Sequence, residues 1–281
     1  MASNSLPRRV VKTLLAPMLN ESTYSLFQAV AMGFDIKRKN WWEPELELID
    51  RVVREGDTAI DIGANFGLWA YYLSRAAGRT GKVYSFEPIP FTARTFRLIA
   101  RGLGFDDNVE LIAKGCGETS GKVVFTVPVM ETGAISAGLV HMHGRNDDRP
   151  GREKHARFPK TKDVECDVVT VDGYLPDVER VSLLKCDVEG ADLYALRGAR
   201  ETLKKHKPVV IVEITPWFLE GFGLAVIDVV SFFEDLGYRC YRYDDGGRLV
   251  PTPADAIVED NWVFVHPDND SRVRALLTTE P

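Results

Sequence analysis

The sequence predicts an α/β fold in which a parallel sheet carries helices on both faces. Strand-like and helix-like patterns alternate over residues 58–113 and again over residues 181–265, which is typical of parallel strands joined by crossover helices. Residues 56–73 read as a strand, a turn with two glycines and a helix. The chain has 281 residues, of which 45% are hydrophobic and 27% charged, so it can bury a large core.

The elements follow one another in a regular order. A periodic segment over 45–54 starts after Pro44 and places apolar side chains on one helical face. The first half continues with strand 58–62, helix 67–77, strand 82–87, helix 90–102 and strand 109–113. Two added strands are expected at 121–128 and 164–171. The second half is expected to contain strand 181–187, helix 191–205, strand 208–214, helix 225–236 and strands 238–243 and 262–265.

The segments outside this alternation are expected to be accessory. Residues 1–55 read as N-terminal cap helices and residues 269–281 as a tail, on either side of a ligand-binding domain over 56–268. Arg8, Arg9 and Lys12 precede apolar residues within 14–19. This pattern favours an amphipathic cap helix, with weak attachment to an anionic membrane surface as the alternative.

Charge and cysteine content narrow the function classes. The net charge of −6 disfavours a surface for nucleic acid. No apolar run approaches the ~20 residues that a membrane-spanning helix needs. The four cysteines lie far apart without a C-x-x-C pair, which favours reduced thiols in a cytoplasmic protein over a disulfide or metal framework.

The glycine turn and the acid after the following strand predict a nucleoside site. Gly63 and Gly67 offer backbone without a Cβ, and the helix that follows begins with unpaired N–H groups. Glu87 comes directly after strand residues 82–86, where an acid can accept hydrogen bonds from both ribose hydroxyls. The alternative interpretation of the glycines alone is an ordinary strand–helix turn of an unrelated α/β protein.

The same turn favours S-adenosylmethionine (SAM) over a dinucleotide. The dinucleotide fingerprint G-x-G-x-x-G has a middle glycine where this chain has Asn65. Asp57, Asp61 and Glu87 disfavour an anionic phosphate and suit the sulfonium and amino group of SAM. An NAD-dependent oxidoreductase is therefore the less favoured enzyme class.

Residues 129–163 read as an insertion with few large apolar side chains. Positions 145–162 hold seven basic side chains against three acidic ones, and loops of this length are usually functional or disordered. A solvated loop is one interpretation, and a substrate lid that attracts an anionic acceptor is the other. His141 and His143 also lie in the insertion, but their spacing alone is weak evidence for a metal site.

Three ordered blocks resemble the FkbM family of SAM-dependent methyltransferases. They are Gly-Asp-x-x-Ile-Asp-Ile-Gly-Ala-Asn-x-Gly at 56–67, Phe-Glu-Pro-x-Pro at 86–90 and Leu-Lys-Cys-Asp-Val-Glu-Gly-Ala-Asp at 184–192. The resemblance covers residues 55–265 and departs from the family pattern at Cys186, usually Ile, and Asp192, usually Glu. It implies a Rossmann-like class I methyltransferase fold with a seven-stranded, mostly parallel sheet. It also implies O-methylation, often of a sugar or natural product.

The cofactor residues can be placed along the carboxyl ends of the strands, where ligands of open α/β sheets bind. Acids lie at four of these ends, at Asp61, Glu87, Asp187 and Glu213. Residues that follow strand 109–113 are expected near the adenine. The expected cofactor-binding set is Asp61, Gly63, Ala64, Asn65, Gly67, Glu87, Pro88 and Lys114.

Methylation of a hydroxyl also needs a base. Asp187 and Glu189 are the candidates by position, with His141 or His143 as rivals. Asp187, Glu189 and Asp192 are hard oxygen ligands that suit Mg²⁺, although their spacing does not require a metal. Glu189 or Asp192 also suits the first turn of a helix. The expected partner is a small-molecule acceptor, glycosylated or anionic; an N-methyltransferase and a non-catalytic SAM-binding module are the alternatives.

Overall fold

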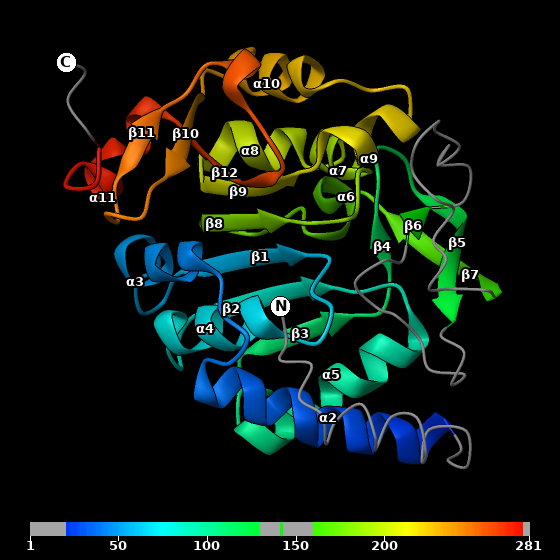
Figure 1. The fold of residues 1–281 in the computed structure, drawn as a ribbon. Helices are drawn as coiled ribbons and strands as arrows, with labels where there is room; N and C mark the ends of the chain where they lie inside the picture. Colours follow the sequence, from blue (N-terminus) through cyan, green and yellow to red (C-terminus); the bar gives the residue numbers. More distant parts are fainter. Residues whose placement is uncertain (1–20, 130–140, 143–159, 278–281) are drawn as a thin grey trace.

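The computed structural model describes residues 21–129, 141–142 and 160–277. Its main sheet contains eight strands, at β1 (Thr58–Ile62), β2 (Lys82–Phe86), β3 (Val109–Ile112), β8 (Val181–Cys186), β9 (Val209–Ile214), β10 (Arg239–Tyr243), β11 (Leu249–Pro251) and β12 (Asp260–Val265). They are arranged in the order β11-β10-β12-β9-β8-β1-β2-β3 (Figure 1).

The sheet confirms the predicted α/β class. Strands β3, β2, β1, β8 and β9 run parallel, and β12 pairs antiparallel with β9. All seven strands expected for the main sheet are present. The count of seven is one too low, because β11 adds a short antiparallel edge strand beside β10. The chain leaves β1 for β2 on one side and returns at β8 on the other, so the order of strands reverses between β1 and β8, where such sheets bind ligands.

Helices cover both faces of the sheet. One face carries α2 (Glu21–Arg38), η2 (Pro44–Leu48), α3 (Ile49–Val52), α4 (Leu68–Ala77) and α5 (Pro90–Leu103). The other carries α6 (Val171–Tyr174), α7 (Asp192–Arg197), α8 (Arg200–His206), α9 (Pro216–Gly221) and α10 (Val226–Glu234). The C-terminal part adds η4 (Ala254–Ala256), η5 (Pro267–Asn269) and α11 (Asp270–Val273).

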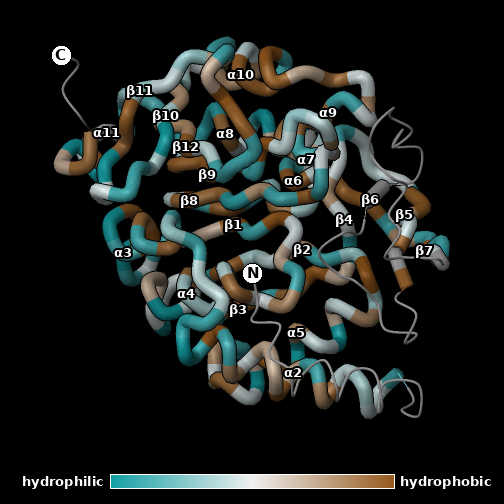
Figure 2. Tube along the Cα trace, viewed as in Figure 1, coloured by the Kyte–Doolittle hydropathy of each residue, from teal (hydrophilic) through white to brown (hydrophobic). Residues whose placement is uncertain are grey.

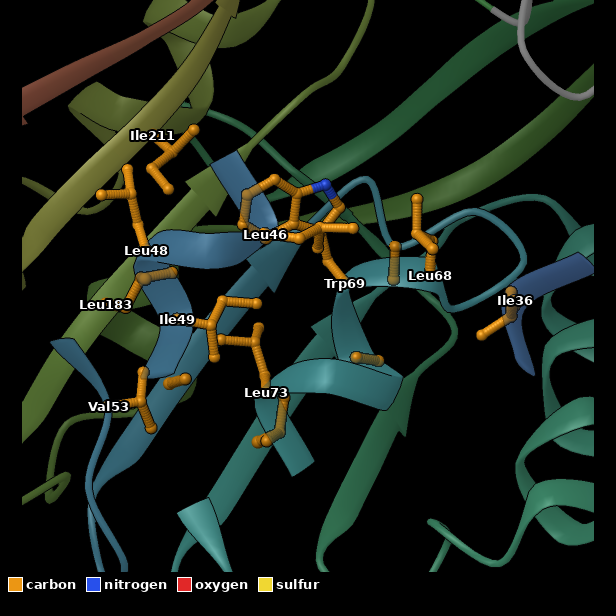
Figure 3. Close-up of a cluster of buried hydrophobic side chains, with 14 of the residues drawn as sticks. Ile36, Leu46, Leu48, Ile49, Val53, Leu68, Trp69, Leu73, Leu183 and Ile211 are labelled. Atoms are coloured by element: carbon orange, nitrogen blue, oxygen red, sulfur yellow. The ribbon is translucent and has the colours of Figure 1, made fainter. Parts of the chain in front are cut away.

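The two faces bury separate hydrophobic clusters because side chains alternate along each strand. Leu183 and Ile211 point to the α4 side, whereas Leu184 and Val210 point to the α8 side. Figure 3 shows Trp69 beside Leu46 in the first cluster. Figure 2 shows hydrophobic residues gathered along the central strands, with polar residues toward the outer loops.

Two of the expected helices differ from the prediction. The segment 45–54 forms a 3-10 helix and then a single α-helical turn instead of one helix. The helix expected at 191–205 is two helices, α7 and α8. The carboxylate of Asp172 accepts hydrogen bonds from the backbone N–H groups of Glu201 and Thr202. This long-range cap fixes a new helix start inside the predicted span.

A second, smaller sheet stands at the carboxyl ends of the main strands. It contains β4 (Gly115–Cys116), β5 (Gly121–Val129), β6 (His141–Met142) and β7 (Lys160–Val169), in the order β4-β7-β5-β6. The two added strands expected from the sequence are β5 and β7, and β7 begins four residues earlier than predicted. The strand β6 lies within the predicted insertion and pairs with β5.

Two further expectations concern thiols and membrane helices. All four cysteines are free. In the part of the chain that the structure describes, no helix has the length and apolar character needed to cross a bilayer.

A buried ion pair ties the C-terminal segment to the start of β1. The carboxylate of Asp57 accepts a hydrogen bond from Arg272 Nη1 at 2.6 Å, and both side chains are almost fully buried. Asp57 also accepts the backbone N–H of Arg54 at 3.0 Å, and Arg272 donates to the carbonyl of Val52. Asp57, which lies in the first block of the family resemblance, therefore has a structural role in holding α11 on α3.

We expect Asp57→Ala to lower the free energy of unfolding by about 3–5 kcal/mol, because Arg272 would keep a buried charge without its partner. Urea unfolding followed by circular dichroism measures this change. The matched control is Glu201→Ala, which removes an exposed pair with Lys204 and should cost less than about 1 kcal/mol. Equal losses in the two variants would contradict the assigned role.

Candidate active site

The turn between β1 and α4 closes against two neighbouring strands. The backbone N–H groups of Gly63 and Ala64 donate to the carbonyl of Phe86 at 3.0 and 2.9 Å. Gly63 and Gly67 have φ angles of 80° and 87°. A Cβ on Gly63 would lie 1.8 Å from the carbonyl oxygen of Asp187, and one on Gly67 would lie 2.9 Å from the ring of Phe96. Close packing and left-handed backbone therefore require both glycines, a reason that the sequence alone did not reveal.

Glu87 braces this turn from the end of β2. Its two carboxylate oxygens accept the backbone N–H groups of Asn65 at 3.0 Å and Ile89 at 2.9 Å. Burial raises the pKa of Glu87 to about 7, although both amide bonds act in the opposite direction. Each oxygen retains a further lone pair, so the role of Glu87 toward ribose hydroxyls stays a prediction.

Asp61 brings an unsatisfied acceptor to the same edge. Its side chain is buried, and no hydrogen-bond donor among the described residues reaches Oδ2. Burial raises the pKa of Asp61 to about 7, Lys185 lowers it, and nearby carboxylates raise it further. A buried acceptor without a donor suits a ligand that brings a cation or an N–H group.

A cavity of about 330 Å³ opens beside the glycine turn. Of the predicted cofactor residues, Gly63 and Pro88 line it, whereas Lys114 does not. The ammonium of Lys114 instead lies 6.0 Å from the ring centre of Tyr174. The walls are mostly apolar and come from both sheets: Ile62, Phe86, Gly115, Cys116, Gly117, Val123, Phe125, Val168, Val188, Ala191 and Tyr194.

Lys185 is the central residue of the site that sequence reasoning did not single out. It is 1% exposed, and its Nζ lies 3.0 Å from Asn261 Oδ1, 3.5 Å from Asp187 Oδ2 and 5.4 Å from the ring centre of Trp69. Burial opposes its charge, but Asp187, Glu43 and Glu213 raise its pKa above the usual value. The sequence did contain a signal for this residue, because a lysine is unusual inside a buried strand and an acid follows this strand directly.

Further hydrogen bonds hold the groups around Lys185. The indole N–H of Trp69 donates to Glu43 at 2.7 Å, and the amide of Asn261 donates to Glu45 at 3.2 Å. These bonds join the segment before β1 to the sheet. The acids around Lys185 come from the loop after β8, from β9 and from the segment before η2.

Asp187 and Glu213 form a second interaction at this edge. Burial and the charge of Asp187 raise the pKa of Glu213 well above its usual value, and a hydrogen bond with Asp187 acts in the same direction. The side chain of Asp187 is 34% exposed, so it can contact a ligand. Asp187 therefore lies between a buried ammonium and a carboxyl group whose pKa is raised.

Asp192 binds the backbone of the loop that follows β8. Its carboxylate accepts the backbone N–H groups of Val188 and Gly190, each at 3.0 Å, and the side chain is buried. Burial and Asp187 raise the pKa of Asp192 to about 6. It fixes the loop that carries Asp187 and Glu189, which has a left-handed φ of 56°.

The structure can be compared with the candidate Mg²⁺ ligands and with one of the two candidate histidine bases. Within the described ranges, no three His, Cys, Asp or Glu side chains are grouped to hold a metal ion, and Asp192 uses its oxygens on backbone amides. The backbone of His141 pairs with Thr126 in the small sheet, beside the cavity residue Phe125. His143 lies outside the described residues.

Comparisons with known proteins give a consistent result. The family model described as the methyltransferase FkbM domain matches residues 61–240. The chain is 28% identical to methyltransferase sdnD of Sordaria araneosa, over 65% of this chain and 74% of that protein. It is 34% identical to protein-L-isoaspartate O-methyltransferase 2 of Archaeoglobus fulgidus, over 37% of this chain. That match spans about half of the archaeal protein, 48%.

A solved structure is also similar. The crystal structure of a methyltransferase FkbM from Methylobacillus flagellatus KT has a TM-score of 0.45 and 17% identity, with 92% of this chain and 59% of that chain covered.

The raised pKa of Asp61 predicts a pH dependence of stability. Its pKa is about 7 in the folded protein against 3.8 as a reference. Between these values the folded protein keeps a proton that the unfolded chain loses, so the free energy of unfolding falls as pH rises from about 4 to 7. Each unit of pKa difference corresponds to about 1.4 kcal/mol.

We therefore expect the stability of Asp61→Asn, relative to the parent, to increase by a few kcal/mol over this pH range. Urea unfolding at several pH values measures the difference, and taking it against the parent cancels the titration of other groups. Parallel stability curves for the two proteins would show that Asp61 titrates normally.

Proposed function

The chain belongs to the FkbM methyltransferase family and uses SAM as its cofactor, and from this premise we propose that it methylates a hydroxyl oxygen of a small molecule. We propose a sugar or natural-product acceptor, as the family resemblance implies. The observation that carries the choice of oxygen is the partly exposed carboxylate of Asp187 beside buried Lys185. The name of the archaeal relative, an O-methyltransferase, is a second support.

We propose that the edge formed by β1, β2 and β8 holds SAM. The unsatisfied Oδ2 of Asp61 would accept from the amino group, Glu87 would accept from the ribose hydroxyls, and the apolar cavity beside Gly63 would enclose the adenine. Ala64, Asn65 and Gly67 would shape the turn that supports these contacts. Four acids at this edge, together with a missing middle glycine, disfavour a cofactor that brings phosphate groups.

Catalysis would then depend on alignment and on one proton transfer. SAM, when bound, supplies an electrophilic methyl group on a sulfonium that is already a good leaving group. Residues that fix the acceptor beside it contribute several kcal/mol by removing translational and rotational freedom. Asp187 would take the hydroxyl proton, and a base in this position accelerates such reactions by about 10²–10⁴-fold.

Lys185 and Glu213 would prepare Asp187 for this step. The ammonium of Lys185, 3.5 Å from Asp187 Oδ2, would hold this carboxylate in position at the edge. Glu213, whose pKa is raised by burial and by Asp187, would orient Asp187 through the hydrogen bond between the two carboxyl groups. Glu189 and His141 remain the rival bases, because one follows Asp187 by two residues and the other lies on the strand beside the cavity wall.

We propose that residues 129–163 bind the methyl acceptor. We also propose that the chain consists of an N-terminal extension over 1–55 and a methyltransferase domain over 56–268. The flanking strands β5 and β7 line the cavity, and the seven basic residues at 145–162 suit a glycosylated or anionic acceptor. We also propose a cytoplasmic location, which the four free cysteines support.

We expect Asp187→Asn to slow methyl transfer at least tenfold while the affinity for SAM changes little, because the amide cannot take a proton. Formation of S-adenosylhomocysteine is measured with a panel of hydroxylated metabolites, glycans and amines. Calorimetric titration with SAM measures affinity. Turnover equal to that of the parent would remove Asp187 from the chemistry.

A second variant, Glu87→Ala, is expected to affect the binding of SAM instead of the proton transfer, and the same assays measure it. It should weaken SAM binding by about 1–3 kcal/mol, because it leaves hydrogen-bond partners unpaired. Glu110→Ala, on the exposed side of β3, is the matched control and should bind SAM as the parent does. Transfer to amines but to no hydroxyl in the panel would replace the proposed O-methylation by N-methylation.

A further inference from the structure

The exposed side of α2 carries an apolar stripe. Leu26, Val30 and Phe34 are 54%, 68% and 51% exposed, and their spacing of four residues places them along one side of the helix. Three of the six large hydrophobic residues that are exposed in the described part of the chain lie in this stripe. The other three, Tyr174, Ile227 and Val258, lie singly on separate segments.

The stripe continues into a groove between α2 and α5, which lie side by side at the β3 edge of the molecule (Figure 1). The groove has a volume of about 320 Å³, and apolar residues form most of its lining: Leu26, Ala29, Val30, Gly33, Phe34, Lys37, Leu98, Ile99, Gly102 and Leu103. We call the stripe and the groove together the α2–α5 face. Exposed apolar side chains that adjoin an apolar groove are typical of interaction sites.

Basic side chains are exposed on both helices of the α2–α5 face. Lys37, Arg38 and Lys39 are exposed at the C-terminal end of α2, and Arg38 lies over the ring of Phe34 at 5.1 Å. On α5, Arg97 and Arg101 are exposed, and each directly precedes a groove residue, Leu98 or Gly102, in the sequence. These five exposed cations lie on or next to the two helices that form the α2–α5 face, in a chain whose net charge is −6.

Acidic groups offset only part of this charge: Asp106 and Asp107 are exposed just after the C-terminal end of α5. Glu21 is paired with Arg94, a sixth basic residue, at 3.3 Å. Asp35 is buried and accepts a hydrogen bond from the side chain of Asn40. The α2–α5 face thus combines exposed apolar side chains with a surplus of positive charge.

We propose that the α2–α5 face docks on an anionic lipid surface. Apolar side chains that enter the headgroup region, with cations that contact anionic lipids, are the two components of peripheral membrane binding. The sequence immediately before α2 has the same character, since Arg8, Arg9 and Lys12 precede apolar residues at 14–19. This docking would bring the enzyme to a membrane and does not depend on the identity of the methyl acceptor.

A second copy of the chain is a less suitable occupant. Symmetric dimers use the same patch on both subunits, so the cations of one α2–α5 face would approach those of the other. Like charges brought together in this way oppose association. An anionic membrane offers the opposite charge together with an apolar interior.

The test is flotation of the full-length protein with vesicles of phosphatidylcholine alone or mixed equally with phosphatidylglycerol. We expect binding to the mixed vesicles only. The variant Leu26→Ser/Val30→Ser/Phe34→Ser should reduce the partition coefficient about tenfold or more, and Arg97→Glu/Arg101→Glu should do the same in a salt-dependent manner. Thermal unfolding and circular dichroism establish that both variants remain folded.

The controls change equivalent residues elsewhere. Ile227→Ser/Val258→Ser removes exposed apolar groups, and Arg239→Glu reverses an exposed charge on β10; both should bind as the parent does. Equal binding by the parent and both α2–α5 variants would overturn the proposal. Equal binding to neutral and anionic vesicles would also overturn it. So would a third outcome, in which the protein does not bind vesicles but self-associates in analytical ultracentrifugation, and the stripe variant abolishes that self-association.

Discussion

The buried ammonium of Lys185 is the interaction on which the active-site edge depends. It lies at the end of β8, in contact with Asn261 and Asp187 and near the ring of Trp69. The carboxylates around it outnumber this one cation, and burial raises the pKa values of Asp61 and Glu213. Because carboxylates outnumber cations at this edge, a second positive charge there would be stabilised. The packing of the central strands, which buries these carboxylates, therefore favours a cofactor that carries a sulfonium.

The fold was predictable where local patterns decide the structure. Alternation of strands and helices predicted the central strands because both faces of the sheet are covered and the strands are continuously apolar. Distant contacts limited the rest: Asp172 caps α8 from another helix and divides a predicted helix in two. The helix α2 lacked a clear amphipathic pattern because Leu26, Val30 and Phe34 lie on its exposed side.

The sequence predicted which residues of the candidate site share an edge of the sheet, but not all of the contacts that they make. Acids at strand ends and the glycine turn were expected at one edge, and the structure brings them together there, since parallel strands share one carboxyl end. The sequence could not show that Gly63 packs against the end of β8, or that Asp192 holds the loop after that strand. Nor could it show that Lys185 is buried among acids, because those acids are brought together only by the sheet and by the segment before η2.

The most direct test of this account is a count of the protons exchanged when SAM binds. Calorimetric titrations at pH 7 in two buffers with different enthalpies of ionisation give this number. If the carboxylates of the edge hold protons for want of a second cation, SAM binding releases protons, and Asp61→Asn releases fewer. Identical binding enthalpies in the two buffers, for the parent as for the variant, would contradict the account.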